Sequence, residues 1–165
     1  MKTLLLNSKQ IDQKINRLAF QIYEDNHSSG SIILAGIITN GFELAKKIAD
    51  KLSKISDFQI TLVEVNIKKH GPFSENVSVN IEKNQLNGKT VILIDDVMNS
   101  GKTMLHAMKP FLDAELNKIR TLVLVDRNHK SYPVSSDFVG LSLATTLKEN
   151  VSVDFLEKEI SAWLE

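Results

Sequence analysis

The chain contains no cysteine among its 165 residues, which excludes disulfide bonds, thiolate catalysis and cysteine zinc sites. The spacing of its four histidines, His27, His70, His106 and His129, is not typical of metal ligands. Lysine plus arginine and aspartate plus glutamate both number 20, so the formal net charge is zero. This balance provides no overall attraction to nucleic acid or to membranes, although a local basic face is compatible with it.

Long apolar runs are also missing. The first apolar run, Leu4–Leu6, is too short for a signal peptide, and no stretch of about 18 apolar residues follows it. We therefore expect a soluble, cytoplasmic protein. The length, together with the absence of repeats, low-complexity tracts and linkers, predicts one domain spanning residues 1–165.

Hydrophobic periodicity predicts alternating helices and strands. Residues 8–26 have the spacing of an amphipathic helix with Ser8 as its N-cap. The other predicted elements are helices starting near residue 41 and spanning 102–116 and 156–163, and strands spanning 31–36, 58–65, 89–95, 119–126 and 151–155. This order predicts an α/β fold with a mostly parallel central sheet flanked by helices, in which ligands bind at the carboxyl ends of the strands. The turns at 37–41, 95–103 and 126–130 all follow predicted strands, so we expect them to converge on one site.

The segment 89–104 is the most informative part of the chain. Its apolar strand ends at Asp95 and Asp96, and the polar turn 99–101 leads into the helix that starts at Lys102. Backbone amides at a turn that enters a helix attract phosphate. Adjacent carboxylates accept hydrogen bonds from sugar hydroxyls or hold Mg²⁺ together with a substrate. The loop is therefore a candidate site for both ends of a ribose 5-phosphate, and the alternative is that the acids only cap the following helix.

Two common nucleotide-binding motifs are absent from the chain. Position 96 is Asp where a Walker A loop requires its first glycine, and no G-x-G-x-x-G occurs in the chain.

Residues 66–86 are polar, and Val77, Val79 and Ile81 alternate with polar residues, which predicts an exposed hairpin. A polar arm between two core strands is a candidate flap over a site, and a plain surface hairpin is the alternative. Residues 127–146 are predicted to be irregular.

Taken together, these segments resemble the type I phosphoribosyltransferases. Within that group the chain most resembles the bifunctional pyrimidine operon regulators that are also uracil phosphoribosyltransferases. The resemblance covers nearly the whole chain and rests on residues 17–22, 34–45, 88–103 and 122–140. The stretch Asp126-Arg127-Asn128-His129 is the part most specific to this branch. The implied fold is that of a type I phosphoribosyltransferase, with a flap over about 66–86 and a hood formed by about 127–146 plus N-terminal residues.

The resemblance also implies roles for individual residues in binding 5-phosphoribosyl pyrophosphate (PRPP). Asp95 and Asp96 match the acids that bind the ribose hydroxyls and hold Mg²⁺ indirectly, and Asn99 joins them as a candidate catalytic residue. The residues that match the phosphate loop are Asn99, Ser100, Gly101, Lys102 and Thr103, and those that match the pyrophosphate loop, which often contains a cis peptide bond, are Thr39, Asn40 and Gly41. The implied base-binding residues are Phe138 and Val139, and Arg127 is a further candidate. The flap departs from the usual sequence of the family, and Lys68 and Lys69, which lie in it, are candidates for contact with pyrophosphate.

The implied reaction transfers the phosphoribosyl group from PRPP to a nucleobase, with uracil expected first, and releases pyrophosphate with Mg²⁺ as cofactor. A homodimer or larger homo-oligomer is also implied. Asn40 departs from the family because the pyrimidine regulators usually carry Arg there, and Asn99 stands where they usually carry Tyr and purine-salvage relatives carry Asp. Because an amide cannot act as a general base, purine salvage by that route is disfavoured.

Two other functions remain as alternatives. One is a nucleotide-sensing, RNA-binding attenuation regulator of pyrimidine genes, for which Lys9, Lys14 and Arg17 would provide a basic face, although Phe20 replaces a His common on this helix. The other is a PRPP-binding protein with weak or lost catalysis. Arg127 and His129 have two alternatives of their own, contact with the base or stabilisation of the hood turn.

Overall fold

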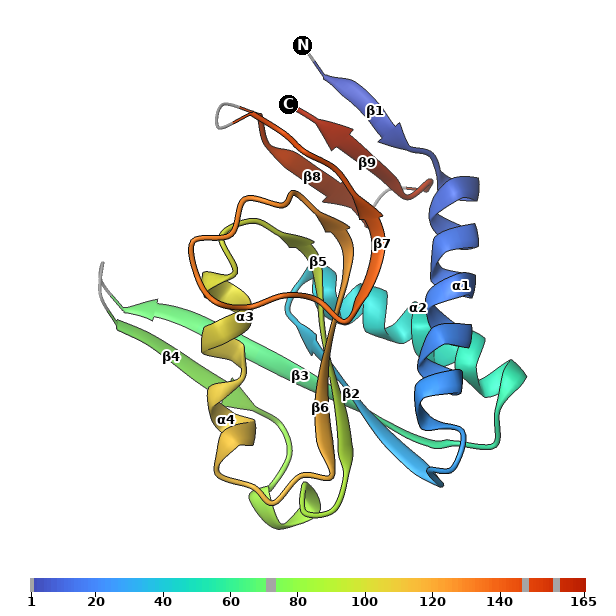
Figure 1. Cartoon of the computed structure of the whole chain (residues 1–165), viewed down its shortest axis with the longest axis vertical. Helices are drawn as coiled ribbons and strands as arrows, with labels where there is room; N and C mark the ends of the chain where they lie inside the picture. The colour runs from blue at the N-terminus through green and yellow to red at the C-terminus, as the bar shows by residue number, and fades with distance from the viewer. Residues whose placement is uncertain (1, 71–73, 147–148, 156–157) are drawn as a thin grey trace.

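The computed structural model describes residues 2–70, 74–146, 149–155 and 158–165 (Figure 1). The elements along the chain are β1 (Thr3–Leu6), α1 (Ser8–Asn26), β2 (Ser31–Ile37), α2 (Asn40–Ile55), β3 (Gln59–His70), β4 (Ser74–Val79), the 3-10 helix η1 (Lys83–Gln85), β5 (Thr90–Met98), α3 (Lys102–Ala107), α4 (Lys109–Leu112), β6 (Lys118–Asp126), β7 (Phe138–Ser142), β8 (Val151–Asp154) and β9 (Ser161–Leu164).

The central sheet has the strand order β4-β3-β2-β5-β6-β7. All neighbours in it are parallel except β4, which is antiparallel to β3. Parallel neighbours bring the carboxyl ends of β2, β5 and β6 to one edge, where polar turns follow each strand. The predicted α/β fold with a mostly parallel sheet is therefore confirmed.

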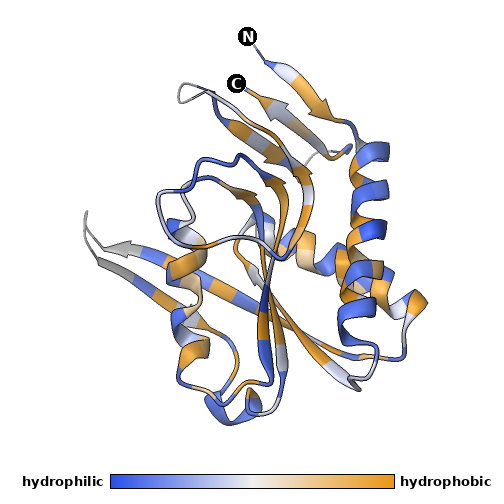
Figure 2. Cartoon of the chain, in the orientation of Figure 1, coloured by the Kyte–Doolittle hydropathy of each residue, from blue (hydrophilic) through white to orange (hydrophobic). Residues whose placement is uncertain are grey.

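The central sheet is covered on both faces, which explains why its middle strands are apolar throughout. Alternate residues of β5, such as Ile92 and Leu93, belong to two different buried clusters. One cluster packs against α1 and α2, and the other packs against α3 and α4, which Figure 1 shows on the opposite side of the sheet. Figure 2 shows the hydrophilic and hydrophobic residues alternating along α1, as expected of a helix with one face buried.

A second, smaller sheet has the order β1-β9-β8 and is antiparallel throughout. It joins a strand from near the beginning of the chain to two strands from near its end, and Figure 1 shows it beyond the end of β5. β8 contacts β5, so this sheet lies next to the edge at which the turns converge.

The helix over 8–26 is confirmed, but its N-cap is Asn7 and not Ser8. The Asn7 side chain accepts a hydrogen bond from the Gln10 backbone N–H at 2.9 Å, and the Gln10 side chain accepts one from the Asn7 N–H at 2.9 Å. This reciprocal pair is a capping box, and it requires the cap one residue earlier than predicted.

Three other predictions about the elements are wrong. The closing helix over 156–163 is replaced by β9, because Ala162 is buried by pairing with Leu6 of β1 and Val153 of β8, and 156–157 lie outside the described residues. The helix over 102–116 divides into α3 and α4 at Met108, because Pro110 in the first turn of α4 has no N–H to continue the helical hydrogen bonds of α3. The segment 127–146 is not irregular throughout, since it contains β7, parallel to β6.

Candidate active site

Two adjacent acids, Asp95 and Asp96, lie near the carboxyl end of β5, between β2 and β6. Asp95 Oδ1 accepts a hydrogen bond from the Asp96 N–H at 2.9 Å, and Asp96 Oδ1 accepts one from the Val97 N–H at 2.9 Å. Burial raises the pKa of the Asp95 carboxyl well above its ordinary value, and the neighbouring Asp96 charge raises it further. The free protein therefore holds the Asp95 proton to higher pH than an exposed aspartate would.

The turn after β5 contains the residues that are predicted to bind phosphate. Gly101 has φ = 86°, a left-handed conformation that favours glycine, and α3 begins directly after it. The carbonyl oxygen of Ser100 accepts hydrogen bonds from the N–H groups of Ser131 and Tyr132 at 3.0 and 3.1 Å, which holds the turn in place. A small cavity of about 130 Å³ lies in the turn, and its lining includes Asp95, Asn99, Ser100, Gly101 and Thr103. Lys102 lies next to this lining, at the first position of α3.

The predicted pyrophosphate loop joins β2 to α2. The peptide bond between Ile38 and Thr39 is cis, as the family resemblance implied. Gly41 allows α2 to start close to β5, since a Cβ atom at this position would lie 2.5 Å from the Ile94 carbonyl oxygen. The start of α2 is thereby held directly beside the two acids.

Asn40 connects this loop to the rest of the site. Its Nδ2 group donates hydrogen bonds to Asp96 Oδ2 at 2.8 Å and to the carbonyl oxygen of Val153 in β8 at 2.9 Å. The amide that replaces the usual Arg therefore links the pyrophosphate loop, the acid pair and the small sheet. No sequence motif contains this link, because its partners are 56 and 113 residues away in the chain.

Arg127 follows the last residue of β6 and is buried, with 7% of its surface exposed. Its guanidinium donates hydrogen bonds to Asn99 Oδ1 at 2.8 Å, to Thr145 Oγ1 at 3.0 Å and to Asn150 Oδ1 at 3.3 Å. The His129 ring is hydrogen-bonded to the carbonyl oxygen of Thr145. Both residues thus contact the segment that leads into β8, which agrees with the second of the two roles considered for them, stabilisation of the hood. Sequence reasoning missed Thr145 and Asn150, which belong to no recognisable motif.

The structure does not bring Phe138 and Val139 to the acid pair and its turn, so their position gives no support to the prediction that they contact the base. They lie at the start of β7, paired with Leu122 and Val123, whereas the carboxyl end of β7 is Ser142, paired with Asp126. Phe138 is four residue steps from Ser142 along the strand, roughly 13 Å. Phe138 is buried in the cluster that packs against α1. The family resemblance had implied a contact of this pair with the base, but in this structure the Phe138 side chain is part of the hydrophobic core.

The predicted hairpin over 66–86 is confirmed as β3 and β4, which are antiparallel over 65–70 and 74–79. Lys68 is exposed on this hairpin and opposite Asn76, and Lys69 is opposite Glu75. Residues 71–73 lie outside the described residues, and the role of the hairpin as a flap stays a prediction.

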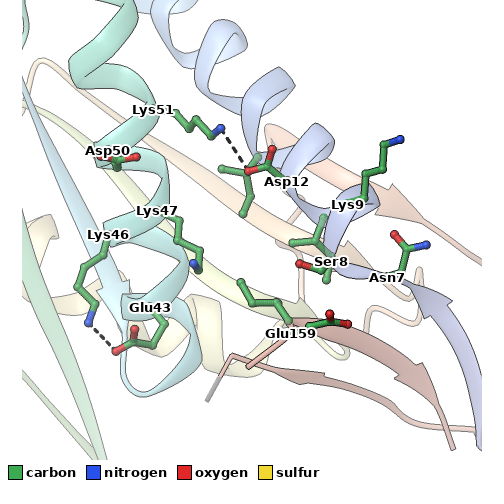
Figure 3. A pocket seen from close by; sticks show the side chains of 13 residues that line it. Asn7, Ser8, Lys9, Asp12, Glu43, Lys46, Lys47, Asp50, Lys51 and Glu159 are labelled. Carbon is green, nitrogen blue, oxygen red and sulfur yellow. Dashed lines mark ion pairs between the residues drawn. The ribbon is translucent and has the colours of Figure 1, made fainter. Parts of the chain in front are cut away.

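A larger cavity lies away from the acid pair. It measures about 1000 Å³ and lies between α1, α2 and residues 159–160 (Figure 3). Both lysines and carboxylates line it, and they form two ion pairs with each other, Lys46–Glu43 at 2.7 Å and Lys51–Asp12 at 3.2 Å. Because the lining contains four lysines and four carboxylates, this cavity shows no preference for a ligand of either charge.

A divalent cation fits the acid pair only together with a substrate. Within the described residues, no group of three or more His, Asp or Glu side chains could hold a metal ion. Mg²⁺ commonly uses one or two carboxylates and completes its coordination with substrate phosphates and water, and the adjacent Asp95 and Asp96 match that requirement. The described part of the chain also contains no helix that is long and apolar enough to cross a membrane.

Comparison with known proteins agrees with this geometry. The family model described as phosphoribosyl transferase domain matches residues 3–157. The bifunctional protein PyrR of Pediococcus pentosaceus is 32% identical over 93% of this chain and 92% of its own length, and that of Haemophilus ducreyi is 33% identical over 93% and 89%.

Solved structures show the same fold. A hypoxanthine-guanine phosphoribosyltransferase of Bacillus anthracis superposes with a TM-score of 0.76 at 18% identity over 96% of both chains. A hypoxanthine phosphoribosyltransferase of Staphylococcus aureus has a TM-score of 0.71 at 16% identity over 86% of this chain and 77% of its own. With the family match and the PyrR relatives, these findings confirm the resemblance noted in the sequence: the chain belongs to the phosphoribosyl transferase domain family.

Proposed function

We propose that this protein transfers the 5-phosphoribosyl group of PRPP to a ring nitrogen of uracil or a related pyrimidine and releases pyrophosphate. The observation that carries the proposal is the meeting of Asp95 and Asp96 with the turn 99–103 and with the loop 39–41 at one edge of the sheet. The names of the curated relatives and the family match favour the same activity.

PRPP fits this edge with its ribose hydroxyls at Asp95 and Asp96 and its 5′-phosphate in the turn from Ser100 to Thr103. The backbone amides at the start of α3 and the Thr103 hydroxyl would donate to the phosphate. The pyrophosphate group then points toward Thr39, Asn40 and Gly41. Mg²⁺, held by Asp95 and Asp96 together with substrate oxygens, would neutralise the charge of the pyrophosphate.

In the reaction the ring nitrogen attacks C1 of the ribose while the bond from C1 to the pyrophosphate oxygen breaks. The ring proton of the base passes to water. Positive charge develops on the ribose, and the acid pair stabilises it electrostatically. The β3–β4 hairpin is a candidate flap that excludes water from this step.

The base would lie near Asn99, Thr145, Asn150 and Val153, because Arg127 and Asn40 bind the last three of these residues to the acid pair and its turn. This replaces the placement against Phe138 and Val139. The central sheet, the hairpin and the small sheet then act as one domain, and we propose that it works in the cytoplasm as a homo-oligomer.

The test is UMP formation from PRPP and uracil with Mg²⁺, with guanine, hypoxanthine and orotate in parallel. We expect product with uracil, and loss of measurable PRPP binding in Asp95→Ala and in Asp96→Ala. The matched control is Asp57→Ala, an exposed acid between α2 and β3. Saturable PRPP binding without product from any base would contradict the proposal and favour a nucleotide sensor. Unchanged PRPP affinity in both acid variants would remove the site assignment.

RNA-binding regulation is the second candidate, because the curated relatives are named bifunctional. Lys14 and Arg17 of α1 line a cavity together with Leu5 and Leu6 of β1. The Arg17 guanidinium, however, already donates hydrogen bonds to the carbonyl oxygens of Val139 and Gly140, at 3.2 and 2.7 Å. We expect a real RNA complex to weaken steeply with salt. Binding that is absent at low salt would exclude this second function and leave the transferase untouched.

A further inference from the structure

The cavity between α1, α2 and residues 159–160 is separate from the proposed active site (Figure 3). Its volume of about 1000 Å³ is large enough for a small organic ligand. One wall is formed by α2, and the other by the start of α1 together with Glu159 and Ile160. Neither Asp95 nor Asp96 lines it, so a ligand bound here would leave the substrate site free.

Most of the charged side chains in the lining are already paired or point elsewhere. The two ion pairs described above use four of them. Asp50 pairs at 2.9 Å with Lys54, which lies outside the lining, and Figure 3 shows Lys9 pointing away from α2. Lys47 and Glu159 remain, and neither forms a hydrogen bond or an ion pair with another residue that the structure describes.

These two unpaired charges are of opposite sign and lie on opposite walls. Figure 3 shows Lys47 on α2 and Glu159 across the cavity from it. Apolar surface is present as well, because Ile160 is partly exposed in the lining, next to the buried Ile11 and Ile15. A simple anion would leave Glu159 unpaired, and a simple cation would leave Lys47 unpaired. Only a ligand that carries both charges pairs with both side chains.

We propose that this cavity is an effector site for a small zwitterion with an apolar body, the chemistry that amino acids and short peptides share. The carboxylate of the ligand binds the Lys47 ammonium, and its ammonium binds the Glu159 carboxylate. The apolar body packs on Ile160 and on the methylene groups of the lining lysines. Binding at this site does not depend on the proposed transferase activity, whereas its effect on PRPP rests on that proposed function.

The position of the cavity connects it to the PRPP site. Asn40 begins α2 and binds the carbonyl oxygen of Val153 in β8 at 2.9 Å, and Lys47 lies two turns further along the same face of α2. Glu159 lies two residues before β9, which pairs with β8. A ligand held between Lys47 and Glu159 therefore joins α2 to the small sheet, as Asn40 does. We expect it to stabilise the arrangement that holds the acid pair and so to tighten PRPP binding, and PRPP must tighten its binding in return.

Calorimetric titration with L-leucine and L-leucyl-L-leucine tests the ligand class and distinguishes an amino acid from a peptide. Leucinamide, which lacks the carboxylate, and 4-methylpentanoate, which lacks the ammonium, are the matched controls. We expect saturable binding of at least one zwitterion, and binding at least about tenfold weaker for each control, because one charged contact is lost. Equal binding of 4-methylpentanoate and leucine, or no saturable binding of any probe up to about 10 mM, would overturn the inference.

Lys47→Gln and Glu159→Gln locate the site, since each removes one charge with little change in size. Both positions are exposed, so the variants should fold and keep the turnover of the wild type without effector. We expect each to weaken binding of the zwitterion about tenfold or more. Lys109→Gln, at an exposed position of α4 outside the lining, is the control and should leave the affinity unchanged. Unchanged affinity in both cavity variants would overturn the assignment of the site.

The effect on PRPP separates this inference from the proposed function. We expect the Kd for PRPP to fall about fivefold or more when the zwitterion is saturating, and this fall to be absent in Lys47→Gln. Charge-dependent binding of the zwitterion without any change in PRPP affinity would overturn the effector role. If the wild type forms no UMP but binds the zwitterion through Lys47 and Glu159, the transferase proposal fails and the binding site stands. If UMP forms and no zwitterion binds, only the inference about this cavity is overturned.

Discussion

At the scale of single residues, two side chains of the site are held in environments that differ from water. Asp95 loses hydration beside a second acid, and Asn40 commits both amide hydrogens to partners from distant parts of the chain. Each arrangement changes the free energy of unfolding of the protein, which can be measured without substrate.

For Asp95 the effect depends on pH. Its pKa is raised in the folded protein and lies near 4 in an unfolded chain. Between these two values the folded state binds more protons, so the free energy of unfolding decreases as pH rises through that window. Asp95→Asn removes the titrating group, and at pH 7–8 we expect it to stabilise the free protein by about 1 kcal/mol, or roughly 2–4 °C in Tm.

The measurement is thermal unfolding between pH 4 and 8 without ligand. The gain should shrink toward pH 4, where Asp95 is protonated in the folded protein and about half protonated in the unfolded chain. Asp57→Asn, at an exposed position, is the control. A pH profile for Asp95→Asn that is parallel to wild type would contradict the assignment of the raised pKa.

Asn40→Ala should destabilise the free protein and weaken PRPP binding. The substitution removes two hydrogen bonds, to Asp96 and to the Val153 carbonyl oxygen, each contributing about 1 kcal/mol. We expect Tm to fall by roughly 4–8 °C and KM for PRPP to rise, because Asp96 loses its fixed orientation. Thr39→Ala is the stability control, since the Thr39 hydroxyl makes no cap hydrogen bond. Equal Tm values for the two variants would contradict the linking role of Asn40.

At the scale of elements, the site depends on how closely α2 approaches the central sheet. Gly36 in β2 and Gly41 at the start of α2 leave no space for a side chain. A Cβ atom on Gly36 would lie 2.4 Å from the Cα atom of Phe42 and 2.7 Å from the carbonyl oxygen of Gly41. This contact sets the distance from Asn40 to the acid pair.

Gly36→Ala should therefore push α2 away from the sheet. We expect a loss of about 1–3 kcal/mol in the free energy of unfolding, together with weaker PRPP binding. Gly30→Ala is a matched control, because a Cβ atom at Gly30 meets nothing within 4 Å. Its stability should stay within about 1 kcal/mol of wild type. Denaturant unfolding measures both, and two variants of equal stability would contradict the close approach.

Hydrophobic periodicity predicts the wrong element near the end of the chain. Residues 156–163 carry apolar side chains whose spacing suited a short helix, yet Ser161–Leu164 pair with strands on both sides. Short apolar segments of this length do not distinguish strand from buried helix. The strand is stabilised by partners at the two ends of the sequence, and no local pattern reveals them.

At the scale of the whole molecule, the small sheet pairs strands from both ends of the chain. β1 and β9 pair with each other, and β8 carries the carbonyl oxygen that Asn40 binds. Leu6 of β1 is buried at 4% exposure in the cluster shared with α1, whereas Leu4 of the same strand is 47% exposed. The base side of the proposed site thus depends on a strand from the opposite end of the chain.

Leu6→Ala tests this dependence. We expect a loss of about 2–5 kcal/mol in the free energy of unfolding, against less than about 1 kcal/mol for the exposed control Leu4→Ala. Hydrogen exchange should rise first in β1, β8 and β9 and remain slow in β2, β5 and β6. A uniform increase over all strands would show that the small sheet has no separate stability.

The sequence by itself determined the fold class and the local shape of the candidate phosphate loop. Those features are local: an apolar strand, two acids, a glycine turn and a helix start follow one another in residues 89–104, and periodicity and turn chemistry predict them. The tertiary structure decided which residues meet that segment. Arg127 donates a hydrogen bond to Asn99. Asn40 donates hydrogen bonds to Asp96 and to Val153 of β8, and Phe138 packs in the core. These outcomes depend on hydrogen bonds and packing between residues far apart in the chain, and such contacts exist only once the strands are arranged in space.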